Sequence, residues 1–474
     1  MTKTAFSILL FLMVNTFAFA QTKSFSLNDI IQIAEGKSTR AQIVASVQKN
    51  KYFAFHSFKV GLRPQLLLNG NLADFSRDYF PVRQADGTIL FQSRSQNYSS
   101  VGLSLSQPVE FTGGTVSLNT NLVRFDDFDR NDRLYNGTLL SLNFNQPIFS
   151  VNELRWNRRI EPLKYTEAVQ QYSSDMIGIS VQTVKYYFDV LSAQEDFILA
   201  KRNLETESNI LRIETKRIDL GTTTKEKILQ IRLQLLKSRQ DLSTAELRIK
   251  STLFNLKSYI GIKDSMNFNL ELPNEIPRLK LNVEEALEFA KKNRPEYISY
   301  KRRRLEAERD LNKAKKDRFK ISMNVGLGLN NTSTGLTNLY SGPKSQQSLS
   351  IGLSVPILDW SRQGNQVSMA TANLNTVEYT IEQEEADLKN EIINIVYSLN
   401  ALSNDIKIAS EADLIGQERF RLVTEQFRFG KVSVNDFNIA VSEKDSFKRA
   451  YISSLRNFWE SYYQLALLTL HKFN

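Results

Sequence analysis

Two parts of the chain alternate apolar and polar residues with a period of two. They lie within residues 64–149 and 320–357, and their polar positions are mostly Asn, Ser, Gly, Thr and Gln, with few charges. Because successive side chains of a strand point to opposite faces, both parts predict β-strands with one apolar face and one face of small neutral residues. Such strands are typical of a barrel wall with lipid outside and water inside, and a soluble β-sandwich with one wet face is the alternative. The apolar members are Leu66, Leu68, Leu72, Val101, Leu103, Leu105, Val116, Leu118, Leu122, Leu140, Leu142 and Phe144, then Ile321, Met323, Val325, Leu327, Leu329, Leu349, Ile351, Leu353 and Val355.

Two longer stretches, residues 150–218 and 359–428, predict very long helices. They contain a single proline, Pro162, few glycines, and many Glu, Lys, Leu, Gln and Ala residues, which favour helix. At ~1.5 Å per residue, each helix would extend roughly 100 Å. Apolar positions that step by four and three residues indicate a coiled-coil seam. These positions are Leu388, Ile392, Ile395, Leu399, Leu402 and Ile406 in the second stretch, with Ile179, Thr183, Tyr186, Val190, Ala193 and Phe197 as their weaker counterparts in the first.

Each long helix is expected to end at a glycine and to be followed by a returning helix. Gly221 and Gly430 suit the left-handed conformation that ends many helices, and Thr or Ser residues that can cap a helix follow both. The returning segments are residues 225–259 and 434–470. Each half of the chain therefore predicts a long helical hairpin with its tip at the glycine.

The two halves are an internal repeat. The segment LNDIIQIAEGKSTR, which begins at Leu27, returns as LNVEEALEFAKKNR at Leu281, and the strand end Gln146–Phe149 (QPIF) returns as Val355–Leu358 (VPIL). A unit of this length is too long for a solenoid repeat and indicates a duplicated domain. We expect a signal peptide over residues 1–20, a first structural repeat over 21–260 and a second over 261–474.

The first half also holds extra residues that the second half lacks. They include two alternating segments, residues 98–107 and 114–124. These segments form either an added hairpin of the sheet or an extracellular excursion, and we favour the excursion. The polar stretches 78–97 and 330–347 are expected to be extracellular loops.

The N-terminus has the pattern of a secretory signal. Lys3 supplies a short positive region, residues 6–14 are apolar, and Ala18-Phe19-Ala20 forms a small-x-small cleavage site before Gln21. Together with the barrel-like strands, this pattern predicts an outer-membrane location. The formal net charge of +10 is compatible with nucleic acid or an anionic surface, but export argues against nucleic acid.

Residues that commonly carry chemistry are scarce. The chain has no cysteine and two histidines, His56 and His471, neither of which has a second ligand at helical spacing. There is no phosphate-binding glycine loop and no nucleophile elbow. We therefore expect no catalytic residues, no cofactor and no metal site, and the protein is not predicted to be an enzyme. A basic run over residues 301–320 is either a solvated helix face or a basic collar near anionic head groups.

The repeat, the QPIF and VPIL strand ends and the two tips together resemble the TolC-like outer membrane efflux family over nearly all of the chain after residue 20. The second tip, Arg428–Phe437 (RFGKVSVNDF), is close to the form that the family has at this place, and the first reads Lys216–Thr224 (KRIDLGTTT). The resemblance implies a fold that is mainly α, with duplicated helical hairpins forming an α-barrel, and with strands that contribute to a trimeric transmembrane β-barrel. The usual member supplies four strands per chain, and the extra segments of this chain depart from that number.

The resemblance also implies a function and partners. It predicts a homotrimeric duct in outer-membrane lipid, with a long periplasmic portion, that exports small molecules or polypeptides together with a periplasmic adaptor and an inner-membrane pump. A non-transporting exported coiled-coil protein is the alternative. By position, Asp436 is a candidate for the periplasmic gate, although Ile439 stands where the family has a second acidic ring. The candidate adaptor-contact residues at the tips are Leu220, Gly221, Thr222, Phe429, Gly430, Lys431 and Val432.

Overall fold

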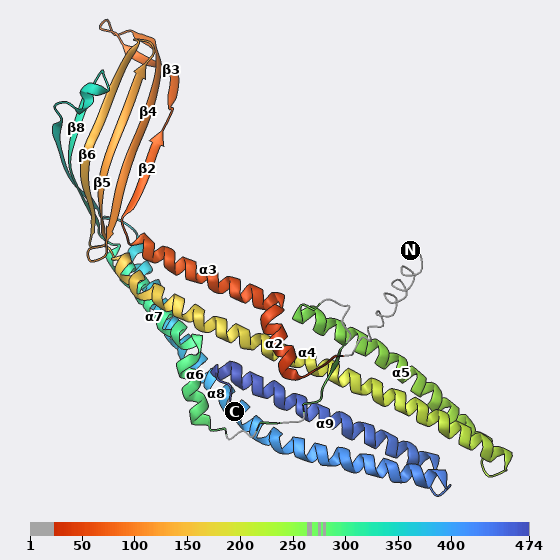
Figure 1. Ribbon diagram of the computed structural model, residues 1–474. Coiled ribbons are helices and arrows are strands. Elements are labelled where there is room, and N and C mark those ends of the chain that lie inside the picture. Colours follow the sequence, from red (N-terminus) through yellow and green to blue (C-terminus); the bar gives the residue numbers. More distant parts are fainter. Residues whose placement is uncertain (1–22, 263–267, 274–275, 278–280, 474) are drawn as a thin grey trace, which may run out of the picture. The chain divides into compact units, whose positions relative to one another are not determined.

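The computed structural model describes residues 23–262, 268–273, 276–277 and 281–473 of the 474-residue chain. The expected signal peptide, residues 1–20, lies outside the described residues. The helices are α2 (Leu27–Lys37), α3 (Thr39–Gly61), α4 (Glu153–Asp219), α5 (Lys225–Ile260), α6 (Val283–Asn293), α7 (Pro295–Lys316), the 3-10 helix η1 (Thr337–Tyr340), α8 (Arg362–Arg428) and α9 (Val434–Thr469). The strands are β1 (Lys23–Phe25), β2 (Gln65–Asn71), β3 (Phe75–Arg83), β4 (Ile89–Val109), β5 (Gly114–Asp127), β6 (Asp132–Ile148), β7 (Phe268–Leu270), β8 (Lys320–Ser333) and β9 (Lys344–Ser354) (Figure 1).

The chain divides into two compact units, which are described separately. Unit 1 comprises Met1–Gln48, Gln170–Arg294 and Ala386–Asn474, and unit 2 comprises Lys49–Val169 and Pro295–Glu385. The predicted long helices and their returning partners are confirmed, because α4 and α8 each span 67 residues and are followed by α5 and α9. None of the helices in the described ranges is both long enough and apolar enough to cross a membrane.

Unit 1 is held together by the buried faces of α2, α4, α5 and α9. Among its fully buried side chains are Tyr187, Phe188, Leu256 and Phe458. The Tyr187 hydroxyl donates to the backbone carbonyls of Phe25, the last residue of β1, and Glu271, the residue after β7, at the end of the parallel pair β1–β7. The predicted seams are largely buried, with Ile392 and Leu399 in α8 and Ile179 and Val190 in α4 among their members.

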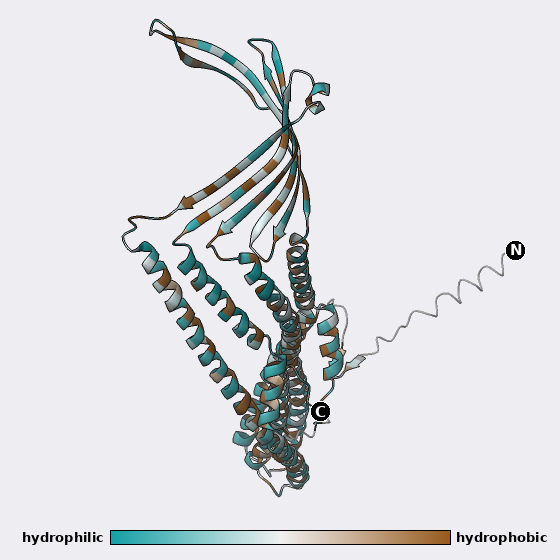
Figure 2. Ribbon diagram, turned by 90° about the vertical axis from the view of Figure 1, so that its left-hand side faces the viewer, coloured by the Kyte–Doolittle hydropathy of each residue, from teal (hydrophilic) through white to brown (hydrophobic). Residues whose placement is uncertain are grey.

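Unit 2 contains an antiparallel sheet. Within the described residues its strand order is β2-β4-β5-β6-β8-β9, and β3 pairs with the distal part of β4. The sequence prediction of strands within 64–149 and 320–357 is confirmed. Figure 2 shows hydrophobic and hydrophilic residues alternating along these strands.

Three expectations about this sheet differ from the structure in whole or in part. Residues 78–97 are not a loop, because most of them form β3 and the start of β4, joined across the strands by the Arg94–Asp78 ion pair. Residues 330–347 are a loop only in part, since β8 runs to Ser333 and β9 begins at Lys344. The favoured excursion is also wrong: segments 98–107 and 114–124 lie in β4 and β5, which pair with each other inside the sheet. The alternative of an added hairpin is therefore correct.

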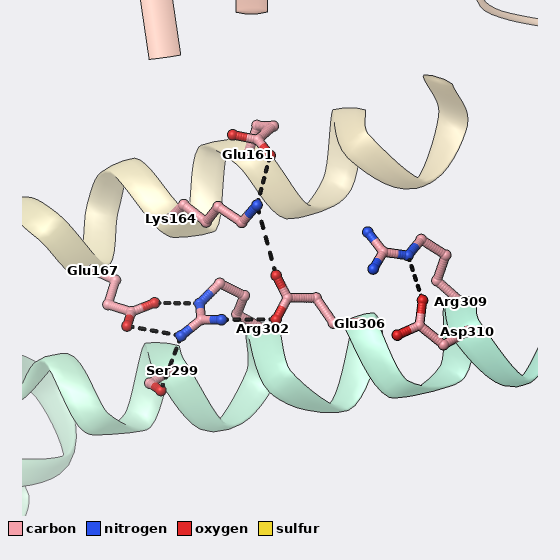
Figure 3. A network of polar contacts seen from close by, with 8 residues as sticks. All are labelled: Glu161, Lys164, Glu167, Ser299, Arg302, Glu306, Arg309 and Asp310. Atoms are coloured by element: carbon pink, nitrogen blue, oxygen red, sulfur yellow. Dashed lines mark hydrogen bonds and ion pairs between the residues drawn. The ribbon is translucent and has the colours of Figure 1, made fainter. Parts of the chain in front are cut away.

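The helices of unit 2 are joined by ion pairs as well as by ring contacts such as Phe55–Tyr165. Between α4 and α7, the Arg302 guanidinium binds both carboxylate oxygens of Glu167, with Nε–Oε2 at 2.5 Å and Nη2–Oε1 at 3.0 Å. It also donates to Glu306, which lies 3.7 Å from the ammonium of Lys164 (Figure 3). Between α7 and α8, Arg303 pairs with Glu384. Part of the basic run of 301–320 therefore links helices, and is not only a solvated face.

Candidate functional site at the helical tips

The two hairpin tips of unit 1 have the same backbone geometry. At the end of α4, the Gly221 amide donates to the Ile218 carbonyl and the Thr222 amide to the Arg217 carbonyl, both at 2.9 Å. At the end of α8, the amides of Gly430 and Lys431 make the equivalent bonds, both at 3.0 Å. Gly221 and Gly430 have φ of 71° and 72°, the left-handed region that side chains disfavour. This pattern is a Schellman motif, so the glycine at each tip ends the helix as the sequence predicts.

The helices that return from the tips begin with side-chain caps. Thr224 accepts from the Lys227 amide at the start of α5, and Ser433 accepts from the Asp436 amide at the start of α9. The Ser433 hydroxyl also donates to Asp436 Oδ2 at 2.6 Å. The gate candidate Asp436 is therefore exposed in the first turn of α9, where a carboxylate also stabilises the helix N-terminus.

A small apolar core lies just behind the tips and joins all four helices. Its fully buried members come from α4, α5, α8 and α9, and Phe420 and Val441 pack against them. They are Ile210, Ile231, Phe427, Val434 and Phe437. The rings of Phe427 and Phe437 lie 5.1 Å apart between centroids. This core holds the two hairpins side by side where they end.

Arg217 links the first tip to the second. Its Nη2 donates to the carbonyls of Phe427 and Arg428, at 3.2 and 3.3 Å, which are among the last carbonyls of α8. Its Nη1 pairs with Glu214, whose carboxylate is fully buried, and its guanidinium lies over the Phe427 ring. A positive group at a helix C-terminus is favourable because the unpaired carbonyls there carry partial negative charge. Sequence reasoning missed this contact, and the spacing Glu214-x-x-Arg217 was the available signal.

Most of the predicted adaptor-contact residues are exposed at the tips. Leu220 is 77% exposed and Phe429 is 80% exposed, and they occupy equivalent places in the two repeats. Gly221, Thr222, Gly430 and Lys431 are also exposed, and Val432 is half-buried. The structure therefore gives each tip one large apolar side chain that points away from the core.

Further along the hairpins, the seam between α4, α5 and α9 is polar. A cavity of about 520 Å³ there is lined by Glu207, Asp445, Arg449 and other polar residues. Asn203 donates to Asp445 at 2.5 Å, and Asp196 pairs with Arg248 and Arg449. Glu207 is buried and has no ion pair or hydrogen bond with other described residues, and this burial raises the pKa of its carboxyl to about 7.

The described part of the chain contains no group of three or more His, Cys, Asp or Glu side chains placed to hold a metal ion. His56 lies beside Tyr52, and His471 stacks on Phe289 at 3.9 Å between centroids. Both histidines are thus engaged in aromatic packing.

Comparison with known proteins gives a consistent picture. The family model described as outer membrane efflux protein matches residues 114–262 and 286–468. Toxin and drug export protein A of Aggregatibacter actinomycetemcomitans is 21% identical over 284 residues, and the aligned region spans 58% of this chain and 58% of that protein. The chain therefore spans little more than half the length of this relative.

Solved structures share the fold at low sequence identity. The CmeC outer membrane channel of Campylobacter jejuni matches with a TM-score of 0.69 and 14% identity, covering 94% of this chain and 86% of that one. The outer membrane protein VceC of Vibrio cholerae matches with a TM-score of 0.65 and 14% identity, covering 94% and 95%. The MtrE outer membrane channel of Neisseria gonorrhoeae, in its open state, matches with a TM-score of 0.63 and 15% identity, covering 94% and 88%.

Proposed function

Because the chain belongs to the outer membrane efflux protein family, we propose that three copies of it form a duct that exports small molecules or polypeptides across the outer membrane. In this proposal the sheets of the three copies together close a transmembrane β-barrel. The helical hairpins form a tunnel on the periplasmic side, and the hairpin tips are its inner end.

The sheet supports a role in lipid. Most of its apolar residues share one face and most of its Ser, Asn and Gly residues share the other, as in the pairs Leu142–Leu327 and Ser141–Gly328 between β6 and β8. Leu67 of β2, which pairs with Ser104, is an exception. Lipid requires every backbone polar group to be paired, so a sheet with an apolar outer face spans a membrane only when it is closed. Three sheets joined edge to edge meet this requirement.

The tips support contact with partners. Leu220 and Phe429 are large apolar side chains that remain exposed in the single chain, beside glycine turns. We propose that they and their neighbours Gly221, Thr222, Gly430, Lys431 and Val432 contact a periplasmic adaptor, which connects the duct to an inner-membrane pump. Binding of the adaptor would bias the tips from a closed to an open arrangement.

Two groups are proposed to act in the gate. Arg217 holds the hairpins together in the closed arrangement through the α8 carbonyls. Asp436 is exposed near the tip and would present a ring of three carboxylates in a trimer. Replacing Asp436 with Asn tests the second group, since the cation preference of the duct should fall if the ring acts on ions.

We also propose that the two repeats, residues 21–260 and 261–474, arose by duplication and act as equivalent halves of the wall. The described tips support this idea, because both end in the same turn and carry one apolar residue at the same place. The duct would perform no chemistry on its cargo, in keeping with a family that is defined by efflux.

The test is conductance of the purified protein in a planar bilayer. A trimer that gives discrete single-channel steps supports the duct. A trimer that inserts into the bilayer and gives no steps, even after substitutions that loosen the tips, supports the alternative of a non-transporting coiled-coil protein. A protein that stays monomeric and soluble without detergent contradicts both the trimer and the membrane location.

A further inference from the structure

The middle of the sheet contains the extra hairpin, β4 and β5. β4 pairs with β2 along residues Gln65 to Asn71, and with β5 from Gln96 to Val109. β5 in turn pairs with β6 along most of its length, with one irregularity at Asn119/Asn121. In the described sheet the hairpin therefore occupies two full places between β2 and β6.

Strands β4 and β6 both end near the helices, and a Gln-Pro pair lies close to the end of each. The glutamine side chain makes the same kind of hydrogen bonds in both strands. In β6, Gln146 Nε2 donates to the carbonyls of Thr112 and Pro147. In β4, Gln107 Nε2 donates to the carbonyls of Leu62 and Pro108. Each glutamine thus binds the carbonyl after itself and a carbonyl in the segment beside the neighbouring strand. The end of β4 is therefore built like the end of β6, as expected if one strand end had been copied.

The turn between β4 and β5 is fixed to the start of α4. Asn152 Nδ2 donates to the carbonyls of Glu110 and Phe111, at 2.7 and 3.2 Å, while Asn152 Oδ1 accepts from the Arg155 amide. Glu110 also pairs with Arg158. These contacts place the turn at the helix end of the sheet, level with the other strand ends.

Both faces of the sheet continue through the extra hairpin. One row of paired residues on the apolar face crosses five strands and contains leucine at every place. It consists of Leu66, Leu105, Leu118, Leu142 and Leu327. The neighbouring row on the other face contains Ser104, Asn119, Ser141 and Gly328. The hairpin therefore meets lipid and water in the same way as its neighbours.

The outermost strands of the path, β2 and β9, have open edges in the single chain. Every residue of both strands is exposed, including Leu68 at 71% and Ile351 at 63%. β2 contains no charge and no proline, and the only charge in β9 is Lys344 at its far end. Proteins that keep an edge unpaired usually protect it with such residues, so these two edges are suited to pairing with another strand.

We propose that three copies of this chain close one sheet of eighteen strands, six from each copy, with β9 of each copy pairing with β2 of the next. This inference rests on the proposed trimeric duct, and it differs from the four strands per chain that the family resemblance implies. The strand directions suit this pairing. Neighbours along the path are antiparallel, and β2 and β9 are an odd number of steps apart, so they run in opposite directions. The new joint is therefore antiparallel like the others.

The register of the joint follows from the helix ends. Within one chain, β8 begins shortly after α7, β9 ends shortly before α8, and the residues at these ends, Lys320 and Ser354, are paired. β2 likewise begins shortly after α3, so its first residue should pair with the last residue of β9 of the next copy. Pairing Gln65 with Ser354 of the next copy then places Leu66 opposite Leu353 and Leu68 opposite Ile351. All four side chains lie on the apolar face, which is the arrangement that lipid requires.

The larger strand number changes the width of the duct mouth. Barrel diameter grows roughly in proportion to strand number, so eighteen strands give a mouth about one and a half times as wide as twelve. The sheet would then pass bulkier cargo than a four-strand-per-chain relative, and the helical tips would set the size limit.

Cysteine cross-linking of the full-length trimer tests the joint, because the natural chain has no cysteine. The variant Leu68→Cys/Ile351→Cys should form disulfide-linked dimers and trimers on mild oxidation, and neither single variant should form linked trimers. The matched pair Leu118→Cys/Ile351→Cys should not link copies, because β5 lies inside the sheet. Linking through the Leu118 pair would show that β2 and β4 lie outside the wall, which overturns the eighteen strands and leaves the trimeric duct intact.

A second measurement tests whether the β4–β5 hairpin lies in the barrel wall or outside it. Leu118→Cys alone should resist a membrane-impermeant maleimide added to intact cells, because Leu118 faces lipid, whereas Phe128→Cys in the β5–β6 connection should be labelled. Rapid labelling at Leu118 would overturn the inference even if the β2–β9 joint forms. If neither pair links copies and the protein migrates as a monomer in detergent, then both the inference and the proposed duct are wrong.

Discussion

Arg217 joins the two helical hairpins at their tips, in addition to the apolar core behind them. Its contacts are with the Glu214 carboxylate and with two main-chain carbonyls of the other hairpin. Hydrogen bonds from a charged donor contribute about 1.5–3 kcal/mol each, so in the proposed gate this group would favour the closed arrangement of the tips. Because removing Arg217 alone would leave Glu214 buried without its partner, a test must change both residues.

We predict that Arg217→Met/Glu214→Gln opens the duct. Loss of about 1.5–3 kcal/mol from the closed arrangement corresponds to a roughly tenfold to hundredfold larger open fraction. The measurement is single-channel open probability of the trimer in a planar bilayer. Lys216→Met changes an exposed neighbour on the same helix and serves as the control. An open probability that is equal in the double variant and the control would contradict the role of Arg217.

Glu207 makes the stability of unit 1 depend on pH. Burial raises the pKa of its carboxyl from 4.5 to about 7. Between these values the folded state keeps a proton that the unfolded state has released, so stability falls as the pH rises through this window. Above about pH 7 the folded protein holds a buried carboxylate, at a cost on the order of 3 kcal/mol.

We predict that Glu207→Gln is more stable than the natural protein at pH 8, and that the difference disappears near pH 4.5. The amide keeps the shape of the carboxyl and never ionises, which removes the cost. The urea midpoint of the far-ultraviolet circular dichroism transition, measured across this pH range, checks the prediction. Glu205→Gln, which changes an exposed residue of the same helix, should follow the natural protein. A Glu207→Gln variant with the natural pH dependence would show that another group is responsible.

The residues of the site could be predicted only in part. Gly221 and Gly430 are predictable because a helix stop is a local property. Leu220 and Phe429 are candidates only because the family resemblance puts adaptor contacts at the tips. Arg217 was missed because its partners are main-chain carbonyls of the other hairpin, and every residue has such a carbonyl whatever its side chain. Contacts of this kind depend on how two distant segments pack.

At the scale of the elements, a network of ion pairs joins α4 to α7. The Arg302 guanidinium binds Glu167 through two parallel hydrogen bonds and also reaches Glu306 (Figure 3). Hydrogen bonding to Glu167 raises the pKa of Arg302, so the group stays charged at any working pH. Both partners are about one-fifth exposed, so the pair is screened less than a surface pair.

We predict that Arg302→Ala lowers the free energy of unfolding by about 3 kcal/mol, because it leaves Glu167 without its partner in a partly buried place. Arg302→Lys should recover only part of this loss, since an ammonium lacks the planar fork that binds both oxygens. Arg304→Ala alters an exposed arginine two residues away and is the control. The measurement is the denaturation midpoint of the trimer. A loss as large in Arg304→Ala would mean that the charge of α7 matters and the specific pair does not.

The elements themselves were largely predictable because their patterns are local. Heptad spacing placed α4 and α8, and alternation placed β5, β6 and β8. Alternation does not determine which strands are neighbours, so the sequence allows segments 98–107 and 114–124 to lie inside or outside the sheet, and the β4–β5 pairing places them inside it. Residues 78–97 do not alternate strictly, because apolar residues are adjacent in Ile89–Phe91, and their strand pairing includes the cross-strand ion pair Arg94–Asp78.

At the scale of the whole molecule, the proposed duct must bind its adaptor through the tips and conduct through the lumen that its wall encloses. These two tasks use different residues. Leu220 and Phe429 are exposed at the tips and pack on no part of the tip core. A change there should therefore separate partner binding from channel formation.

We predict that Leu220→Glu/Phe429→Glu weakens binding of the periplasmic adaptor at least tenfold while trimer formation and bilayer conductance persist. Each substitution replaces a large apolar side chain with a charge, and burying an unpaired carboxylate at the contact is unfavourable. Binding of the purified adaptor encoded nearest to this chain's gene can be measured on immobilised trimer. Asp219→Asn changes the exposed residue beside Leu220 without removing apolar surface, and it should bind like the natural protein. If the double variant keeps full affinity and Asp219→Asn loses it, the adaptor recognises charge at the tips, and the apolar contact proposed here is wrong.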